Sequence, residues 1–333
     1  MATSMSSVEI VFLDQDSLPV ALPALPFEHQ LRHFSRTDRE LVLERCLDAD
    51  IVITNKVGFD ATTLSQLPRL KMLAVAATGV NHIDLEACRQ ASIAVSNVRH
   101  YGDDTVAEHA FLLMLALIKN LPAYQRDIRA GAWQQAEQFC HFGAPIRDLQ
   151  GAELGIVGSG GIGQALAARA RAFGMRVWFS ERKGAAIIRP GYLSFDQMLS
   201  CCDVISLHCP LNSETRHLIA ADELARMKPG ALLINCARGG LVNETDLLAA
   251  LEQGRLGGAG FDVLESEQPQ NGSALLDSKL PQLLVTPHIA WASQTAKPPL
   301  IRSPIMVKKN PGPPNTRPTL RAPVLPLPKS RTS

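Results

Sequence analysis

Three residues in the C-terminal half of the chain could together hold an anion and move a proton. Arg238 lies among small residues after an apolar run, Glu267 lies in an acidic loop, and His288 follows another apolar run. Taken singly, a surface arginine, a solvated glutamate and a structural histidine are each ordinary. Together they supply a clamp for a carboxylate, a proton donor or acceptor, and a carboxylate to orient it, which is the set that hydride transfer to a 2-oxo acid needs.

Three glycines have the spacing of a phosphate-binding turn. Gly158, Gly160 and Gly163 form the pattern G-x-G-x-x-G after an apolar strand at 154–157 and before a predicted helix over 164–173. Gly158 permits a tight turn, Gly160 lets a pyrophosphate approach the backbone, and Gly163 lets the helix lie close to the strand. Free N–H groups at the helix start would face the phosphates. The bare motif also fits an ordinary glycine turn, and the flanking strand and helix favour the dinucleotide interpretation.

An acidic residue follows the next predicted strand, at 175–179. Glu181 comes 18 positions after Gly163, close to where a dinucleotide fold places the acid that accepts hydrogen bonds from the adenosine ribose. NAD is therefore the predicted cofactor, because a carboxylate there repels the 2′-phosphate of NADP. Arg182 and Lys183 follow directly and could partner that phosphate, so NADP stays open as the alternative. Taken alone, Glu181 can also be interpreted as an ordinary solvated glutamate in a loop.

The elements that must position these residues alternate between strand and helix. The predicted strands cover 8–13, 50–54, 71–77 and 93–96 before the glycine turn, and 204–208, 231–235, 260–263 and 283–286 after it. Such alternation predicts an α/β protein with parallel sheets, whose ligands bind past the carboxyl ends of the strands. The apolar helix predicted over 106–118 is either a core helix or part of a subunit interface.

Bulk properties restrict the class of protein. The 333 residues suggest two domains, and 46% hydrophobic residues suffice for sizeable cores. The first 296 residues hold 25 basic and 32 acidic residues, a net charge of −7, which argues against a nucleic-acid-binding surface. Seven cysteines without a C-x-x-C pair indicate reduced cytoplasmic thiols and no metal site. The N-terminus is unlike a signal peptide, and the longest apolar run is too short to span a membrane.

Several separate motifs resemble the D-isomer-specific 2-hydroxyacid dehydrogenases. They are 158–163, 235–242 (NCARGGLV), 261–263 with Glu267, and 286–291 (TPHIAW), with further matches at 106–108 and 227–230. The motifs occur in the right order and cover roughly residues 8–296. FDVLESEQP and TPHIAWAS are most similar to the glycerate dehydrogenase (hydroxypyruvate reductase) branch of that family.

The resemblance implies an architecture of two Rossmann-like, doubly wound parallel-sheet domains. A substrate domain at 1–97 would be interrupted by an inserted NAD-binding domain at 98–288, and 289–296 would form the return hinge. The active site would lie between the domains. We expect a homodimer that acts on a small 2-hydroxy or 2-oxo acid and binds neither nucleic acid nor a membrane.

The resemblance also implies a role for each site residue. Arg238 would bind the substrate carboxylate and carbonyl oxygen, His288 would protonate that oxygen, and Glu267 would pair with the other imidazole nitrogen and favour imidazolium. The backbone at Ala77, Thr78 and Gly79 would hold the carboxylate, and Trp291 would wall the pocket. Asp262 would contact the nicotinamide carboxamide. The remaining residues of the predicted cofactor site are Thr105, Gly161, Ile162, Pro210 and Cys236.

The predicted activity is NAD-linked interconversion of D-glycerate and hydroxypyruvate, with glyoxylate as a second substrate. A D-lactate- or phosphoglycerate-type dehydrogenase is one alternative, although no extra basic cluster for a phosphate lies near 77–81. A dinucleotide-sensing binding protein, like the co-repressors that resemble this family, is another. The third alternative is an inactive copy damaged at its C-terminus.

The end of the sequence motivates that third alternative. From Lys297 onward the chain holds ten prolines, eight basic residues and no acidic residue, where the family continues with a long helix. No ordinary helix runs through such a segment, so we expect 297–333 to be disordered. The abrupt change suggests a reading-frame change or a mis-joined gene model. A proline-rich ligand segment for a partner is the rival interpretation.

Overall fold

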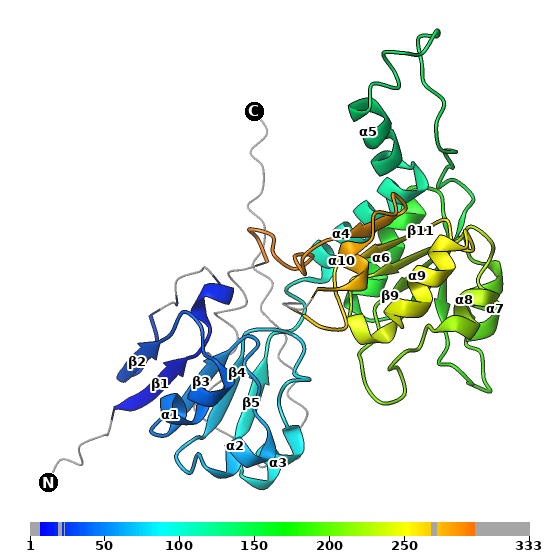
Figure 1. Cartoon of the computed structure of the whole chain (residues 1–333). Coiled ribbons are helices and arrows are strands. Elements are labelled where there is room, and N and C mark those ends of the chain that lie inside the picture. Colours follow the sequence, from blue (N-terminus) through cyan, green and yellow to red (C-terminus); the bar gives the residue numbers. More distant parts are fainter. Residues whose placement is uncertain (1–6, 19–21, 23, 268–271, 297–333) are drawn as a thin grey trace, which may run out of the picture.

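The computed structural model describes residues 7–18, 22, 24–267 and 272–296. Two parallel sheets flanked by helices make up two bodies that are joined side by side (Figure 1). The first sheet has five strands in the order β2-β1-β3-β4-β5, and the second has seven in the order β12-β11-β10-β9-β6-β7-β8. The predicted fold class, α/β with two doubly wound parallel sheets, is therefore confirmed. The predicted tail at 297–333 lies outside the described residues.

The five-stranded sheet packs apolar residues on both faces. Helix residues such as Val42 and Leu64 cover one face, and loop residues such as Leu18 and Leu25, together with Trp291, cover the other. Along β1, Val11 packs into one core cluster and Ile10 and Phe12 into another, and Val52 and Ile53 in β3 divide in the same way. Alternating side chains point to opposite faces of a strand, so continuous apolar runs suit a doubly covered parallel sheet. Its strands are β1 (Val8–Phe12), β2 (His29–His33), β3 (Ile51–Thr54), β4 (Met72–Val75) and β5 (Ala94–Asn97), and its helices are η1 (Gln15–Ser17), η2 (Arg39–Leu41), α1 (Val42–Cys46), α2 (Ala61–Ser65) and α3 (Leu85–Gln90).

The seven-stranded sheet changes winding direction at its centre. From β6 the chain proceeds outward through β7 to β8, then returns to the other side of β6 and continues from β9 to β12. A doubly wound sheet opens a crevice at such a switch point, beyond the carboxyl ends of the strands. The strands are β6 (Glu153–Val157), β7 (Arg176–Ser180), β8 (Tyr192–Leu193), β9 (Val204–Leu207), β10 (Leu232–Asn235), β11 (Gly258–Phe261) and β12 (Leu283–Val285), and the helices are α4 (Asp103–Ile118), α5 (Leu121–Arg129), α6 (Gly161–Ala172), α7 (Phe195–Cys201), α8 (Ala221–Arg226), η3 (Gly239–Leu241), α9 (Glu244–Glu252) and α10 (Ala274–Asp277).

The apolar helix α4 is a core helix of the seven-stranded sheet. It packs against α6, β10 and β11, and Gly260 of β11 leaves room for it, because a Cβ there would lie 3.0 Å from the Cβ of Leu113. The helix begins at Asp103, three residues before the predicted start, since the polar residues 103–105 form its first turn. Among the described helices, none alone is long and apolar enough to cross a bilayer, and the pair α4 and α5 that is long enough together is bent by 59°.

Several elements were absent from the sequence prediction, namely β2, α5, β8, α7, α8 and α10. Strand β2 has the sequence HQLRH and is mostly exposed at the sheet edge, so neither apolar content nor alternation marks it. Helix α5 and the loop after it extend away from the seven-stranded sheet as an arm (Figure 1).

The domain boundaries at 97, 288 and 296 stay a prediction.

Candidate active site

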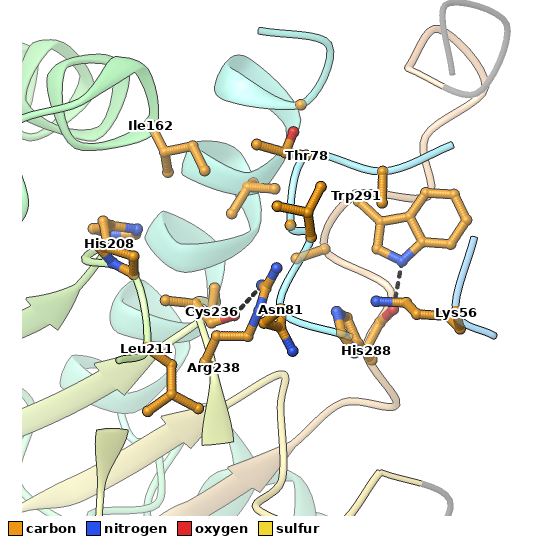
Figure 2. A pocket seen from close by; sticks show the side chains of 18 of the residues that line it. Lys56, Thr78, Asn81, Ile162, His208, Leu211, Cys236, Arg238, His288 and Trp291 are labelled. Carbon is orange, nitrogen blue, oxygen red and sulfur yellow. Dashed lines mark hydrogen bonds between the residues drawn. The ribbon is translucent and has the colours of Figure 1, made fainter. Parts of the chain in front are cut away.

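A cavity of about 770 Å³ lies between the two bodies, where the carboxyl ends of strands from both sheets meet (Figure 2). The loops after β3 and β4 contribute residues from one side, and the loops after β9, β10, β11 and β12 contribute from the other. Predicted site residues in its lining are Ala77, Thr78, Gly79, Ile162, Pro210, Cys236, Arg238, Asp262, His288 and Trp291. The other predicted residues lie outside the lining: Thr105, Gly158, Gly160, Gly161, Gly163, Glu181 and Glu267.

Arg238 projects into this cavity from the loop after β10. Its Nη1 donates to the carbonyl oxygen of Ala237 at 2.6 Å, and its Nε lies 3.5 Å from Oδ1 of Asn81, across the cavity. The guanidinium also packs on Gly79, where any Cβ would collide with it. The cation therefore lies directly against the backbone at Gly79, and the guanidinium and this backbone could bind one carboxylate together.

His288 and Glu267 form an ion pair at the edge of the cavity. Nδ1 of His288 lies 3.0 Å from Oε1 of Glu267. Burial alone would raise the pKa of Glu267, but the hydrogen bond and charge of His288 and the charge of Lys56 hold that pKa below its ordinary value. The carboxylate is therefore charged at neutral pH, and its contact with the imidazole is weakened as the pH falls through this lowered pKa. With Nδ1 engaged, Nε2 is the ring nitrogen left for a substrate.

Asp262 fixes the backbone that carries His288. Its Oδ1 accepts from the hydroxyl of Thr286 at 2.6 Å and from the N–H of Ile289 at 3.0 Å, and its Oδ2 accepts from the N–H of Ala290 at 2.8 Å. His288 itself has φ +54°, a left-handed conformation that a non-glycine residue adopts only where its surroundings impose it. The described contacts thus support a positioning role for Asp262, and its contact with a nicotinamide carboxamide stays a prediction.

The glycine turn fits a dinucleotide pyrophosphate. Gly158 has φ +111°, and a Cβ there would lie 2.6 Å from the carbonyl oxygen of His208. A Cβ on Gly163 would collide with the carbonyl of Gly158, and one on Gly161 with the carboxylate of Asp103, whereas Gly160 faces open space. No side chain caps the start of α6, so its first N–H groups and the open surface at Gly160 suit a phosphate group.

Glu181 follows β7 beside this turn, as predicted, but its carboxylate already has a partner. Arg189 holds it through Nε at 2.6 Å, Nη2 at 2.8 Å and its backbone N–H at 3.0 Å. These hydrogen bonds keep the pKa of Glu181 below its ordinary value. Lys183, one of the two candidates for a 2′-phosphate, is paired with Glu223 at 2.8 Å. Hydrogen bonding of Glu181 to a ribose stays a prediction, and it would have to be shared with Arg189.

Two other predicted residues connect the cavity to its surroundings. Oγ1 of Thr105 lies 3.0 Å from Oγ of Ser293, which ties the first turn of α4 to the return segment. Trp291 donates from Nε1 to the carbonyl oxygen of His288 at 2.8 Å and packs against apolar clusters of both bodies. Both contacts hold the 289–296 segment against the rim of the cavity.

The sequence interpretation missed several residues of the cavity lining. Asn55 and Lys56 follow β3, Asn81 and Tyr101 come from the same body, and His208 directly follows β9. The sequence does contain a signal for them, because each is a polar residue that lies directly after a strand or in the loop that follows one. Burial raises the pKa of Tyr101 to about 12, although Arg238 opposes this, so its hydroxyl is a neutral hydrogen-bonding group.

Comparison with known proteins agrees with the site. The sequence model of the D-isomer specific 2-hydroxyacid dehydrogenase NAD binding domain matches residues 111–290. A glycerate dehydrogenase of Methylorubrum extorquens is 44% identical over 289 residues, covering 86% of this chain and 91% of that protein. A hydroxypyruvate reductase of Blautia hydrogenotrophica is 35% identical over 266 residues, covering 79% and 82%.

A solved structure is similar over nearly the whole described chain. The D-lactate dehydrogenase of Aquifex aeolicus, complexed with NAD and lactic acid, has a TM-score of 0.74 at 26% identity and covers 89% of this chain and 93% of its own. The predicted family, enzyme class and cofactor NAD are thereby confirmed. The chain belongs to the D-isomer-specific 2-hydroxyacid dehydrogenases, enzymes that use NAD.

Proposed function

We propose that this enzyme interconverts D-glycerate and hydroxypyruvate, with glyoxylate as a second 2-oxo acid substrate. The observation that carries the proposal is the placement of Arg238 and His288 on one cavity, with Glu267 3.0 Å from the histidine. The similarity to a glycerate dehydrogenase and a hydroxypyruvate reductase supports the choice of substrate.

Each residue has a distinct part in this proposal. Arg238 and the backbone N–H groups near Gly79 bind the substrate carboxylate, and Arg238 also polarises the 2-oxo group. Nε2 of His288 gives a proton to the carbonyl oxygen, and Glu267 stabilises the imidazolium form before that transfer. Bound NADH supplies the hydride. Trp291 walls the cavity beside His288 and restricts the length of the substrate.

Consumption of NADH in the presence of each acid tests the proposal. We expect hydroxypyruvate and glyoxylate to accelerate NADH oxidation, and NADPH to be a poorer cofactor because Glu181 repels a 2′-phosphate. A dinucleotide-sensing binding protein, or an inactive copy, would bind NADH without oxidising it when an acid is added. Rapid oxidation with pyruvate and none with hydroxypyruvate would instead indicate a D-lactate-type enzyme.

We further propose that the enzyme is a cytoplasmic homodimer joined through the arm. Helix α5 and the loop that follows it to residue 146 carry several large apolar side chains that are exposed. Among them, Phe139 is 92% exposed and Phe142 is 83% exposed. Such residues are costly to leave in water, and a second copy of the arm or of the surface beneath it would cover them. All seven cysteines are free, which suits a reducing compartment.

Replacing both arm phenylalanines by serine is expected to convert a dimer into a monomer. Light scattering coupled to size-exclusion chromatography should give about twice the 36.1-kDa chain mass for the parent and one chain mass for the double variant. Ile187→Ser is the matched control, because Ile187 is also exposed, at 79%, but lies outside the arm, in the loop between β7 and β8. A parent that elutes as a monomer, or a double variant that stays dimeric, would contradict the proposed interface.

A further inference from the structure

Lys56 is a second cation of the active-site cavity, besides Arg238. It follows β3 by two positions and lines the cavity with Asn55 from the same loop. In Figure 2, Lys56 and Arg238 lie on opposite sides of His288. A substrate held by Arg238 and facing His288 would therefore present its far end toward Lys56.

The backbone at Lys56 is held by a buried carboxylate. Both oxygens of Asp14 accept from the N–H of Asn55, at 2.9 and 3.1 Å, and Oδ2 also accepts from the N–H of Lys56 at 2.7 Å. Burial raises the pKa of Asp14, and these hydrogen bonds oppose that rise. A buried carboxylate is costly unless it is fully hydrogen-bonded, so this arrangement locks the loop in one conformation and fixes where the lysine side chain starts.

The acids nearest to Lys56 are engaged elsewhere. Asp14 is bound by backbone N–H groups, and Glu267 is paired with His288. Within the part of the chain that the structure describes, the ammonium of Lys56 has no hydrogen bond or ion pair. Burial and the like charge of Arg238 lower its pKa, and the two acids oppose this. The cavity thus contains a cationic donor that the described protein groups do not satisfy.

The substrate carboxylate provides a binding partner for Arg238 and leaves Lys56 without one. An ammonium is a compact charge with three donors and has no planar fork that matches a carboxylate. It is therefore better suited to donate to a single hydroxyl oxygen than to bind the carboxylate that Arg238 already holds. The substrate atom farthest from the carboxylate in hydroxypyruvate is the oxygen on C3. Glyoxylate has no C3, and pyruvate has a methyl group there.

We propose that Lys56 donates a hydrogen bond to the C3 hydroxyl of the substrate and makes the enzyme select 2-oxo acids that carry an oxygen at C3. This inference rests on the proposed function, since it assigns the far end of the same substrate. It makes Lys56 a specificity-determining residue, with no part in the hydride or proton transfer.

The test compares three acids that differ only at C3. For Lys56→Met we expect kcat/KM with hydroxypyruvate to fall roughly 10- to 100-fold, the range for a lost hydrogen bond to a charged group, and kcat/KM with glyoxylate and pyruvate to change less than about 3-fold. Lys56→Arg should restore part of the loss. Lys71→Met is the matched control, because Lys71 precedes β4 at the opposite end of the sheet and is 77% exposed. Equal losses with all three acids would show that Lys56 binds the carboxylate and would overturn the proposal, as would no loss at all.

A binding measurement separates this inference from the proposed function. D-glycerate and D-lactate differ only in the C3 hydroxyl, and their affinity for the NADH-bound protein can be measured without turnover. Tighter binding of D-glycerate that disappears in Lys56→Met supports the inference even if the parent reduces none of the three acids, a result that would refute the proposed function alone. Equal binding of the two acids to the parent refutes the inference alone.

Discussion

Replacing His288 is expected to lower kcat for hydroxypyruvate reduction by about 10²- to 10⁴-fold, the usual contribution of a positioned general acid. The reason is that Nε2 is the ring nitrogen free to reach the substrate, while Nδ1 is occupied by Glu267 at 3.0 Å. Because φ at this position is +54°, asparagine is a better replacement than alanine, since asparagine tolerates the left-handed region and alanine does not. The measurement is steady-state kinetics of His288→Asn at saturating NADH.

Two controls make this result interpretable. NADH affinity, measured by fluorescence, should be nearly unchanged, because His288 is not part of the glycine turn. His33→Asn, in the exposed edge strand β2, should leave kcat unchanged. A His288→Asn enzyme within a few-fold of the parent kcat would refute the assignment of His288 as the proton donor.

The fold was predictable because its strongest signals are local. The apolar runs of β3, β4, β9 and β10 are bounded by turns and buried on both faces, so their sequence alone marks them as parallel strands. The glycine turn is equally local, since Gly158 and Gly163 lie in one strand–turn–helix unit. Strand β2 carries no such signal, because four of its five residues are polar and β1 is its only partner among the described strands.

The site was less predictable because its contacts join distant segments. The sequence shows that His288 follows a strand. It does not show that Asp262 accepts from the Thr286 hydroxyl before that histidine and from two backbone N–H groups after it. Glu181 has the spacing of a ribose-binding acid, and its pairing with Arg189 depends on how the next loop folds back. Lys56 is placed by Asp14, which is 42 positions away in the chain. Pairings of this kind arise from the tertiary fold and leave no spacing pattern.

The largest combined loss of binding and catalysis is expected for Arg238→Ala. Arg238 would bind the substrate carboxylate and polarise its carbonyl, so the variant loses about two charge-assisted hydrogen bonds of roughly 1.5–3 kcal/mol each. That corresponds to a decrease in kcat/KM of about 10²- to 10⁴-fold. Because the carboxylate contact exists before and during the reaction, KM should rise, and because the carbonyl contact strengthens as charge develops, kcat should also fall.

Arg238→Lys tests whether charge or geometry matters at this position. A lysine keeps the positive charge but loses the planar fork, and its ammonium would no longer pack on Gly79 as the guanidinium does. We expect it to recover only a small part of the lost kcat/KM. Arg216→Ala is the matched control, because Arg216 belongs to the same body and pairs with Glu265 outside the cavity lining. A normal KM in Arg238→Ala would show that the backbone near Gly79 binds the substrate carboxylate without help from the arginine. The carboxylate-binding role would then belong to that loop and not to Arg238.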